Sequence, residues 1–212
     1  MNSVLVINSS ARQQRSITRQ LIDTLLNELT DNIETDVVHR DVGAQPPGFI
    51  DEQWIDAVFT SPQQRSASQQ ARLAESERLI AELKNASIIV IGAPMYNYGM
   101  PAALKAWFDQ IIRVDKTFSF DLSRGDYPIE PLLNDKTLVL LTSKGEFGFS
   151  PEGPRAMHNH LDNHIQTLSR YLGASRTHEV HVEYQEFSDD RHQYSLNAAR
   201  LKAKELGIKL RS

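Results

Sequence analysis

Residues 88–101 read Ile88-Ile89-Val90-Ile91-Gly92-Ala93-Pro94-Met95-Tyr96-Asn97-Tyr98-Gly99-Met100-Pro101, and this stretch decides the fold class. Its first four residues form a short β-branched run, which is typical of a strand buried on both faces. Gly92 and Pro94 are expected to end the strand, and residues 96–99 to form a turn. Pro101 suits the first turn of a helix, because it has no N–H to leave unpaired. Open α/β sheets bind ligands at such strand–turn–helix junctions.

The rest of the chain repeats this order. Apolar runs predict further strands, and apolar residues at helical spacing predict the helices between them. The further expected strands are Val4–Ile7, Thr35–Val42, Thr137–Thr142 and His178–Phe187. Two expected helices begin at Ile17 and at Pro101, and three others span Ser68 to Lys84, Pro154 to Leu172 and Ser188 to Leu206. Strands and helices thus alternate about five times, which predicts an α/β three-layer sandwich with a five-stranded parallel sheet and helices on both faces.

Composition limits the classes of protein. A chain of 212 residues can fill one core and does not need two, so a single domain over residues 1–212 is expected. The net charge of −4 and the scattered Lys and Arg residues do not suit a nucleic-acid partner. The absence of cysteine excludes disulfides, thiolate metal sites and a cysteine nucleophile. Neither a signal peptide nor a membrane span is recognisable, so the cytoplasm is the expected location.

Three loops that follow strands carry the chemistry: Ser9–Thr18, Met95–Tyr98 and Ser143–Glu146. In a parallel sheet these loops meet at one edge. The first has Ser16 as a plausible helix N-cap, and a helix N-terminus is a natural seat for phosphate. The other interpretation is a connecting loop with a cap, because neither a Walker A nor a Gly-x-Gly-x-x-Gly pattern is present. The aromatic turn and the Gly145 turn supply flat faces and backbone N–H groups suited to a planar cofactor.

Several residues have two interpretations. Arg12 and Arg15 either contact a phosphate or are solvated, and Tyr96 and Tyr98 either face a ligand or line the core. For Trp107 and Phe108, core or subunit packing is favoured over a cofactor site. His160 and His164 stand four residues apart, as metal ligands can on a helix, but a solvated or interface face is favoured and no metal site is expected. Residues 113–133 lack a helical period and have the length of a functional lid.

A set of motifs spread over most of the chain carries a family resemblance. They are Ser9-Ser10, Ser16, Ala93-Pro94-Met95-Tyr96-Asn97-Tyr98, Pro101, Leu104-Lys105, Phe108-Asp109, Arg113, Thr117-Phe118 and Thr142-Ser143-Lys144-Gly145. With them the chain resembles the FMN-dependent NAD(P)H:quinone oxidoreductases known as azoreductases, a branch of the flavodoxin-like fold. The Pro-Met-Tyr-Asn motif followed by Pro and Leu-Lys is the specific part of the match.

The resemblance implies a site for non-covalent FMN. The cofactor-binding residues would be Ser10, Ser16, Ile17 and Thr18 for the phosphate, Met95, Tyr96, Asn97 and Tyr98 for the ring system, and Ser143, Lys144, Gly145 and Glu146 at the pyrimidine end. The backbone N–H of Asn97 would point at flavin N5. Phe118 and Phe120 would cap the flavin as substrate-binding residues or pack into a second subunit, since the family's site is completed in a homodimer.

The resemblance also implies the reaction: NADH or NADPH gives hydride to flavin N5 and leaves, and a quinone or azo compound then receives two electrons. No residue is named as acid, base or nucleophile. Glu146 replaces a glycine common in the family, and Phe120 replaces an aromatic residue that often has a hydroxyl, so substrate range is where differences are expected. A flavodoxin-type electron carrier is the main alternative, and a non-enzymatic FMN-dependent regulator is a third class without support in the residues.

Overall fold

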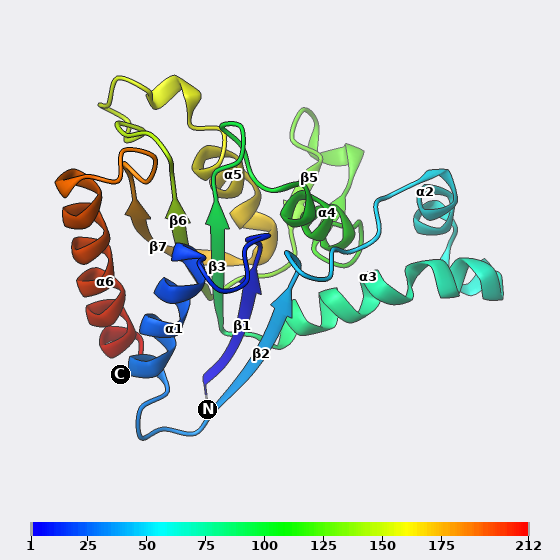
Figure 1. Cartoon of the computed structure of the whole chain (residues 1–212). Helices are drawn as coiled ribbons and strands as arrows, with labels where there is room; N and C mark the ends of the chain where they lie inside the picture. The colour runs from blue at the N-terminus through cyan, green and yellow to red at the C-terminus, as the bar shows by residue number, and fades with distance from the viewer. Residues whose placement is uncertain (1, 212) are drawn as a thin grey trace.

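The computed structural model describes residues 2–211 and has a central parallel sheet (Figure 1). Its strands are β1 (Asn2–Asn8), β2 (Thr35–Asp41), β3 (Ile88–Pro94), β6 (Lys136–Ser143) and β7 (Ala174–Val182). They lie in the order β2-β1-β3-β6-β7, and every pair is parallel. This five-strand order is that of a flavodoxin-like doubly wound sheet. The predicted fold class is therefore confirmed.

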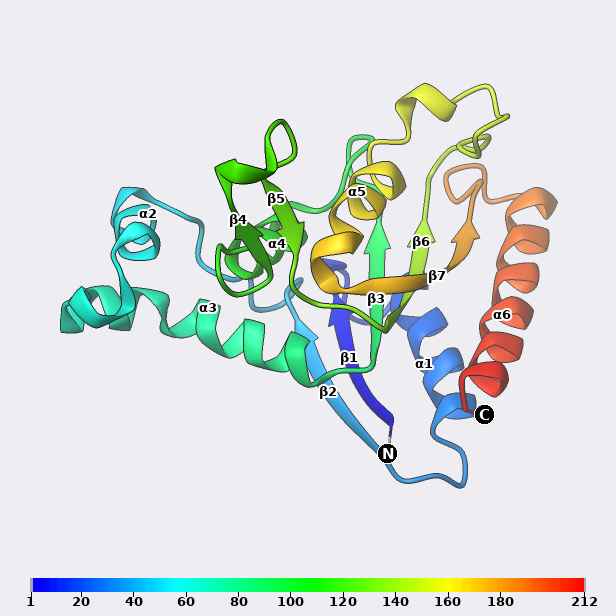
Figure 2. The same cartoon turned by 180° about the vertical axis from the view of Figure 1, so that it is seen from behind.

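Helices cover both faces of the sheet (Figures 1 and 2). The α-helices are α1 (Ile17–Leu29), α2 (Glu52–Phe59), α3 (Ala67–Asn85), α4 (Ala102–Ile111), α5 (Asp162–Leu172) and α6 (Asp190–Arg211), with short 3-10 turns at Pro62–Gln64, Leu122–Arg124 and Ala156–His158. Helices α3, α4 and α5 pack on one face of the sheet, and α1 and α6 pack on the other. Of the residues 2–211, no helix is long and apolar enough to cross a membrane.

Alternate residues of each strand enter the two cores, because successive side chains of a strand point to opposite faces. Leu5, Ile89 and Leu138 belong to the core under α3–α5, whereas Val4 and Val90 belong to the core under α1 and α6. Trp107 and Phe108 are fully buried in the first core, which confirms their interpretation as core residues. The prediction of one domain over residues 1–212 extends beyond the described residues and stays a prediction.

Two element boundaries differ from expectation in ways that affect the sheet edge. Gly92 and Pro94 do not end β3, which continues through Pro94 because its neighbour β6 continues alongside as far as Ser143. Proline is tolerated here because β1, the neighbour of β3 on its other side, pairs with it only as far as Gly92. Pro101 stands at the N-cap of α4 rather than inside its first turn.

The other differences lie near the C-terminus. Helix α5 begins at Asp162, not at Pro154, because residues before it form a 3-10 turn; Gly173, in a left-handed conformation, ends it as predicted. Strand β7 is the strand expected at His178–Phe187, but it begins at Ala174 and ends at Val182. Residues 183–189 therefore form a loop at the carboxyl edge.

The segment 113–133 is not an irregular loop. It contains the antiparallel strands β4 (Phe118–Phe120) and β5 (Ile129–Pro131), joined through a turn with Gly125 at φ 70°. The hairpin stands beside α4 and α5, as Figure 2 shows. Phe118 packs edge-on against Tyr171 of α5, with the ring centroids 5.8 Å apart.

Candidate functional site

The loops at the carboxyl ends of the strands are hydrogen-bonded to one another, so the sheet ladder continues into them. Ser9 donates through its N–H and its hydroxyl to the Gly92 carbonyl, at 3.1 and 2.8 Å. The Met95 N–H donates to the Ser143 carbonyl at 2.8 Å, and the Lys144 N–H donates to the Val182 carbonyl at 2.8 Å. Four segments that are distant in sequence are thereby fixed side by side.

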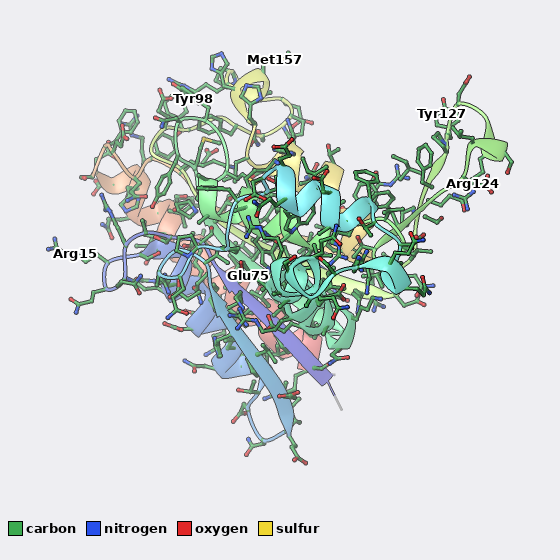
Figure 3. All side chains as sticks on the ribbon, turned by 90° about the vertical axis from the view of Figure 1, so that its right-hand side faces the viewer. Arg15, Glu75, Tyr98, Arg124, Tyr127 and Met157 are labelled. Carbon is green, nitrogen blue, oxygen red and sulfur yellow. The ribbon has the colours of Figure 1, made fainter. Side chains whose placement is uncertain are left out.

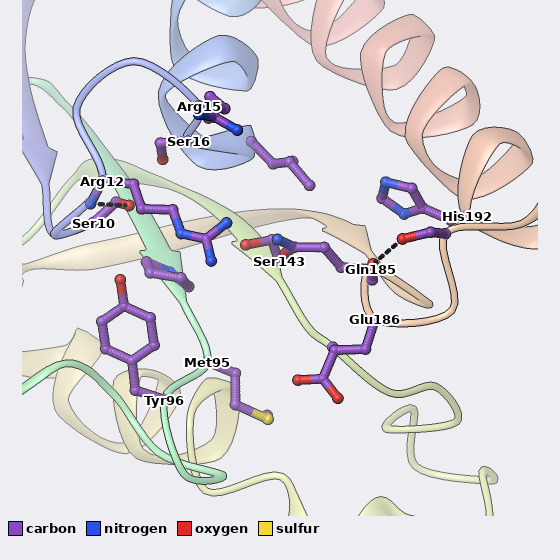
Figure 4. Close-up of a pocket in the computed structure, with 14 residues that line it drawn as sticks. Ser10, Arg12, Arg15, Ser16, Met95, Tyr96, Ser143, Gln185, Glu186 and His192 are labelled. Atoms are coloured by element: carbon purple, nitrogen blue, oxygen red, sulfur yellow. Dashed lines mark hydrogen bonds between the residues drawn. The ribbon is translucent and has the colours of Figure 1, made fainter.

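A cavity of about 630 Å³ opens between these loops (Figure 4). Its volume lies in the range of small-molecule and cofactor sites. The lining residues come from all three predicted loops and from the segment after β7: Ser10, Arg12, Arg15, Ser16, Ile17, Pro94, Met95, Tyr96, Ser143, Gly145, Gln185, Glu186, Ser188 and His192. The expectation that the three loops meet at one edge is confirmed.

One end of the cavity is the N-terminus of α1. The Ser16 hydroxyl accepts from the Arg19 N–H at 3.4 Å, and the Ser16 carbonyl accepts from the Gln20 N–H at 3.2 Å. The N–H groups of Ile17 and Thr18 have no acceptor within residues 2–211. No acidic side chain occupies the first turn, and Arg12 and Arg15 stand at the rim. Free N–H groups, a helix dipole and two guanidinium groups make this end a seat for an anion.

Arg19 holds the loop that forms this seat. Its guanidinium donates to the carbonyls of Ser10 and Arg12 at 2.9 and 3.0 Å, and to both carboxylate oxygens of Asp41 at 2.7 and 2.8 Å. Burial alone would raise the pKa of Asp41, but the hydrogen bonds from Arg19 and from the Ala44 N–H outweigh it and lower that pKa. Asp41 is therefore ionised, and it anchors the guanidinium that shapes the loop.

Because the folded pKa of Asp41 is depressed, the Arg19–Asp41 pair stabilises the fold above the unfolded pKa of about 4 and loses that contribution as the pH falls further. Asp41→Asn should lower the free energy of unfolding at neutral pH by about 1.5–3 kcal/mol, the range of hydrogen bonds to charged groups. The deficit should shrink below about pH 4. Urea titrations of both proteins between about pH 7 and pH 2.5 measure it; a deficit that is constant with pH would contradict this role.

The other end of the cavity is a tight aromatic turn. Tyr96 and Gly99 exchange two backbone hydrogen bonds of 3.0 Å, and Asn97 and Tyr98 between them have φ of 48° and 66°. Left-handed backbone is tolerated by asparagine and is uncommon for tyrosine, so this turn is strained at its second position. The Tyr96 hydroxyl accepts from the Ala11 N–H at 3.3 Å, which ties the turn to the first loop.

Seven of the twelve predicted cofactor-binding residues line the cavity: Ser10, Ser16, Ile17, Met95, Tyr96, Ser143 and Gly145. Thr18 is buried beneath it, with its hydroxyl 3.1 Å from that of Ser16. Asn97 stands at the tip of the turn, and its N–H has no acceptor within residues 2–211. The roles assigned to these residues stay predictions.

The other three predicted cofactor-binding residues and the two predicted substrate-binding residues point elsewhere. Lys144 is buried on the opposite side of its turn, where Nζ lies 2.5 Å from Asp162. The Tyr98 hydroxyl donates to Glu146 at 3.0 Å, and Glu146 also pairs with Arg155 at 3.2 Å. The hydrogen bond to Glu146 raises the pKa of Tyr98. In this chain Phe118 and Phe120 lie on the β4–β5 hairpin and do not line the cavity.

The loop after β7, residues 183–189, forms one wall of the cavity, and the sequence analysis does not predict it. Its Gln185 and Glu186 N–H groups donate to the carbonyls of Lys144 and Gly145 at 3.3 and 3.1 Å. Gly145 leaves room for it: a Cβ there would lie 2.7 Å from a carboxylate oxygen of Glu186. The sequence analysis extends the fifth strand to Phe187. A predicted strand end at Val182 would have identified this loop.

The metal interpretation of the histidines has no geometric basis. His160 precedes α5, so it does not share a helix face with His164. Within residues 2–211, no cluster of three or more His, Cys, Asp or Glu side chains is arranged to hold a metal ion.

Comparison with known proteins adds an independent observation. Residues 2–206 match a family model described as a flavodoxin-like fold. The chain is 47% identical to FMN-dependent NADH:quinone oxidoreductase 2 of Idiomarina loihiensis, over 99% of this chain and 91% of the relative. It is also 47% identical to the protein of the same name in Colwellia psychrerythraea, with 94% of each chain covered. The chain belongs to the FMN-dependent NADH:quinone oxidoreductase family.

Solved structures agree on the fold of this family member. The azoreductase of Bacillus anthracis strain Sterne superposes with a TM-score of 0.87, covering 99% of this chain and 100% of that one, at 20% sequence identity. An FMN-dependent NADH-azoreductase of the same species, solved in complex with FMN, also gives 0.87 at 16% identity, with both chains fully covered. At these identities the likeness concerns the fold.

Proposed function

We propose that this oxidoreductase binds FMN without a covalent bond in the cavity of Figure 4 and uses NADH to reduce quinones and azo compounds. The main evidence for the proposal is that one cavity has two chemically different ends. A helix N-terminus with free N–H groups suits a phosphate, and the Met95–Tyr96 platform suits a planar ring. The names of relatives at 47% identity support the same cofactor and reaction.

The residues present fit the cofactor. The N–H groups of Ile17 and Thr18 and the hydroxyls of Ser10 and Ser16 would hold the phosphate, and Met95 and Tyr96 would lie against the ring. Gly145 would present backbone at the pyrimidine end. When bound, FMN would supply the two-electron redox chemistry that links NADH oxidation to reduction of the acceptor.

The protein's own part is binding and orientation. Arg19 fixes the phosphate loop, the Ala11–Tyr96 hydrogen bond fixes the platform against it, and the Gly145–Glu186 pairing fixes the far wall. Because these groups are already held by hydrogen bonds, little reorganisation is needed when the ligand enters. No side chain is assigned to proton transfer.

Turnover distinguishes the enzyme from an electron carrier. The purified chain with FMN is mixed with NADH and menadione, and NADH absorbance is followed. We expect sustained oxidation over many turnovers, with parallel lines in double-reciprocal plots because donor and acceptor bind in turn. Reduction of the bound flavin without continued NADH consumption would instead assign the carrier function.

Tyr98→Phe measures whether the second tyrosine of the turn contacts the cofactor. Its hydroxyl donates to Glu146 outside the cavity, so its removal should change the Kd for FMN by no more than about twofold, within the ±0.5 kcal/mol typical of surface changes. Tyr96→Phe is the matched control and should have the larger effect, because it breaks the contact with Ala11. FMN fluorescence titrations compare them; a greater loss in Tyr98→Phe would reverse the assignment.

The expected homodimer, with the site completed by a second subunit, stays a prediction, as does the cytoplasmic location. The choice between NADH and NADPH rests on the relatives' names, which specify NADH at 47% identity and NAD(P)H in a relative of Pseudomonas aeruginosa at 36%.

A further inference from the structure

Within residues 2–211, Glu186 is the one acidic residue that lines the cavity, and the proposed function makes no use of its carboxyl group. It belongs to the loop after β7, and Figure 4 shows its carboxyl group extending into the cavity on the side of Met95. Arg15 and Ser16, at the phosphate end, lie on the other side of that view. This carboxyl group therefore concerns the ring of the cofactor and not its phosphate.

Backbone hydrogen bonds hold Glu186 opposite Gly145. The Glu186 N–H donates to the Gly145 carbonyl at 3.1 Å, and the N–H of Gln185 before it donates to the Lys144 carbonyl at 3.3 Å. The side chain then runs over Gly145: a Cβ there would lie 2.7 Å from Oε1, 2.8 Å from Cδ and 2.9 Å from Cγ of Glu186. Because position 145 is a glycine, the carboxyl group can lie against the turn proposed to meet the pyrimidine end of the flavin.

The carboxyl group of Glu186 is free to accept a hydrogen bond from a ligand. Within residues 2–211 its side chain takes part in no hydrogen bond and no ion pair. The other acidic side chains of loops 143–148 and 183–189 are all bonded: Glu146 to Tyr98 and Arg155, Glu183 to the N–H groups of Gly148 and Phe149, and Asp189 to Arg191. The one unpaired carboxylate of these loops is thus the one that faces the cavity.

The charge of Glu186 acts at the aromatic end of the cavity. The pKa of Tyr98 is raised chiefly by its hydrogen bond to Glu146, and the negative charge of Glu186 adds to that rise. Tyr98 belongs to the aromatic turn, and it stands well apart from Arg15 of the first loop in the view of Figure 3. A negative charge therefore lies near the place proposed for the flavin ring, away from the seat of the phosphate.

The pyrimidine edge of FMN has one N–H group, N3–H, between two carbonyls. A carboxylate only accepts, and its hydrogen bond from an N–H is stronger than that of a neutral acceptor. Hydride from NADH adds two electrons and one proton to the ring, so the reduced ring carries one more negative charge than the oxidised ring. That charge spreads over the pyrimidine, and a carboxylate fixed beside it disfavours the reduced form.

We infer that Glu186 is an FMN-binding residue: its carboxylate accepts a hydrogen bond from flavin N3–H and lowers the midpoint potential of the bound flavin. The inference rests on the proposed function, because it needs FMN in this cavity. It gives Glu186 two separable effects. The hydrogen bond acts on binding of the oxidised ring, and the charge acts on the difference between the oxidised and reduced rings.

Glu186→Ala and an FMN methylated at N3, which has no N–H to donate, together test the hydrogen bond. Glu186→Ala should weaken FMN binding by about tenfold or more, as expected for a lost hydrogen bond to a charged group. It should not weaken binding of the methylated FMN. Glu152→Ala, on an exposed residue that does not line the cavity, should leave both affinities unaltered. Fluorescence titrations of the flavin-free proteins measure these affinities.

Glu186→Gln separates the charge from the hydrogen bond, because its amide oxygen can still accept from N3–H. It should retain more of the FMN affinity than Glu186→Ala does. The affinity for reduced FMN relative to oxidised FMN should rise about tenfold, which is about +30 mV in the midpoint potential of this two-electron couple. Anaerobic equilibration with a reference dye measures the potential, and Glu152→Gln is the matched control that should show no shift.

Glu186 is exposed, so both of its variants should fold as the unaltered chain does, which circular dichroism checks. Three results would overturn its role: unchanged FMN affinity in Glu186→Ala, an equal loss for FMN and its methylated form, or a potential in Glu186→Gln that does not rise. In each of them the unaltered chain still binds FMN, so the proposed function stands. An unaltered chain that binds no FMN would instead overturn the proposed function, and this inference with it.

Discussion

Lys144→Met should lower the free energy of unfolding by about 3–5 kcal/mol, the loss found when a buried ion pair loses one partner. Lys144 and Asp162 are 2% and 5% exposed, and their charged atoms lie 2.5 Å apart. Methionine keeps the length and apolar stem of lysine, so the effect isolates the charge. The Asp162 carboxylate would remain buried with a single donor, Asn159. Urea denaturation followed by circular dichroism measures the change.

The protein contains its own control for this prediction. Lys105 and Asp109 are also 2.5 Å apart, but their side chains are 44% and 30% exposed. Lys105→Met should cost only about 0.3–0.5 kcal/mol, as is usual for exposed pairs on a helix. The double variant Lys144→Met/Asp162→Asn should be more stable than Lys144→Met, because it removes the uncompensated charge. Equal losses in Lys144→Met and Lys105→Met would mean that the Lys144–Asp162 pair is solvated.

Gly43→Ala should weaken FMN binding by tenfold or more, about 1.4 kcal/mol for each factor of ten. Gly43 follows β2, and a Cβ there would lie 2.2 Å from the Ser10 carbonyl oxygen and 2.7 Å from the Ser10 carbonyl carbon. Both are backbone atoms, so the loop that carries Ser10 into the cavity must move. Overpacking of this kind should also cost about 1–3 kcal/mol of stability.

Gly48→Ala separates this steric effect from the general cost of replacing a loop glycine. A Cβ at Gly48 would have its nearest neighbour, a Glu75 side-chain oxygen, at 3.4 Å, which is ordinary contact. Fluorescence titrations of FMN into both variants and the unaltered chain give the comparison. If Gly43→Ala binds FMN as tightly as Gly48→Ala does, the first loop is not the phosphate seat.

The fold could be predicted because local patterns and the tertiary structure agree. Runs such as Ile88–Ile91 are apolar at every position, as a strand covered on both faces requires, and Ser16 and Gly173 mark helix ends through local geometry. The length of β3 could not be predicted, since Gly92 and Pro94 locally oppose a strand and only the pairing with β6 keeps them in it.

The site could be predicted in part for the same reason. Ser10, Tyr96 and Gly145 follow directly from the ends of strands whose position is clear in the sequence. The side chain of Lys144 points away from the cavity because it pairs with Asp162, eighteen positions later. It also points away because successive residues of an extended chain face opposite sides. Glu186 was not predicted because the alternation after His178 continues past the residue where the ladder ends.

A titration of the flavin-free chain with FMN, read by the quenching of flavin fluorescence and by the absorbance of the yellow complex, tests the central claim most directly. Four strand-end loops that meet around one cavity predict a single FMN per chain, with a Kd of about 1 μM or tighter. A protein that stays colourless and leaves FMN fluorescence unquenched would contradict the account.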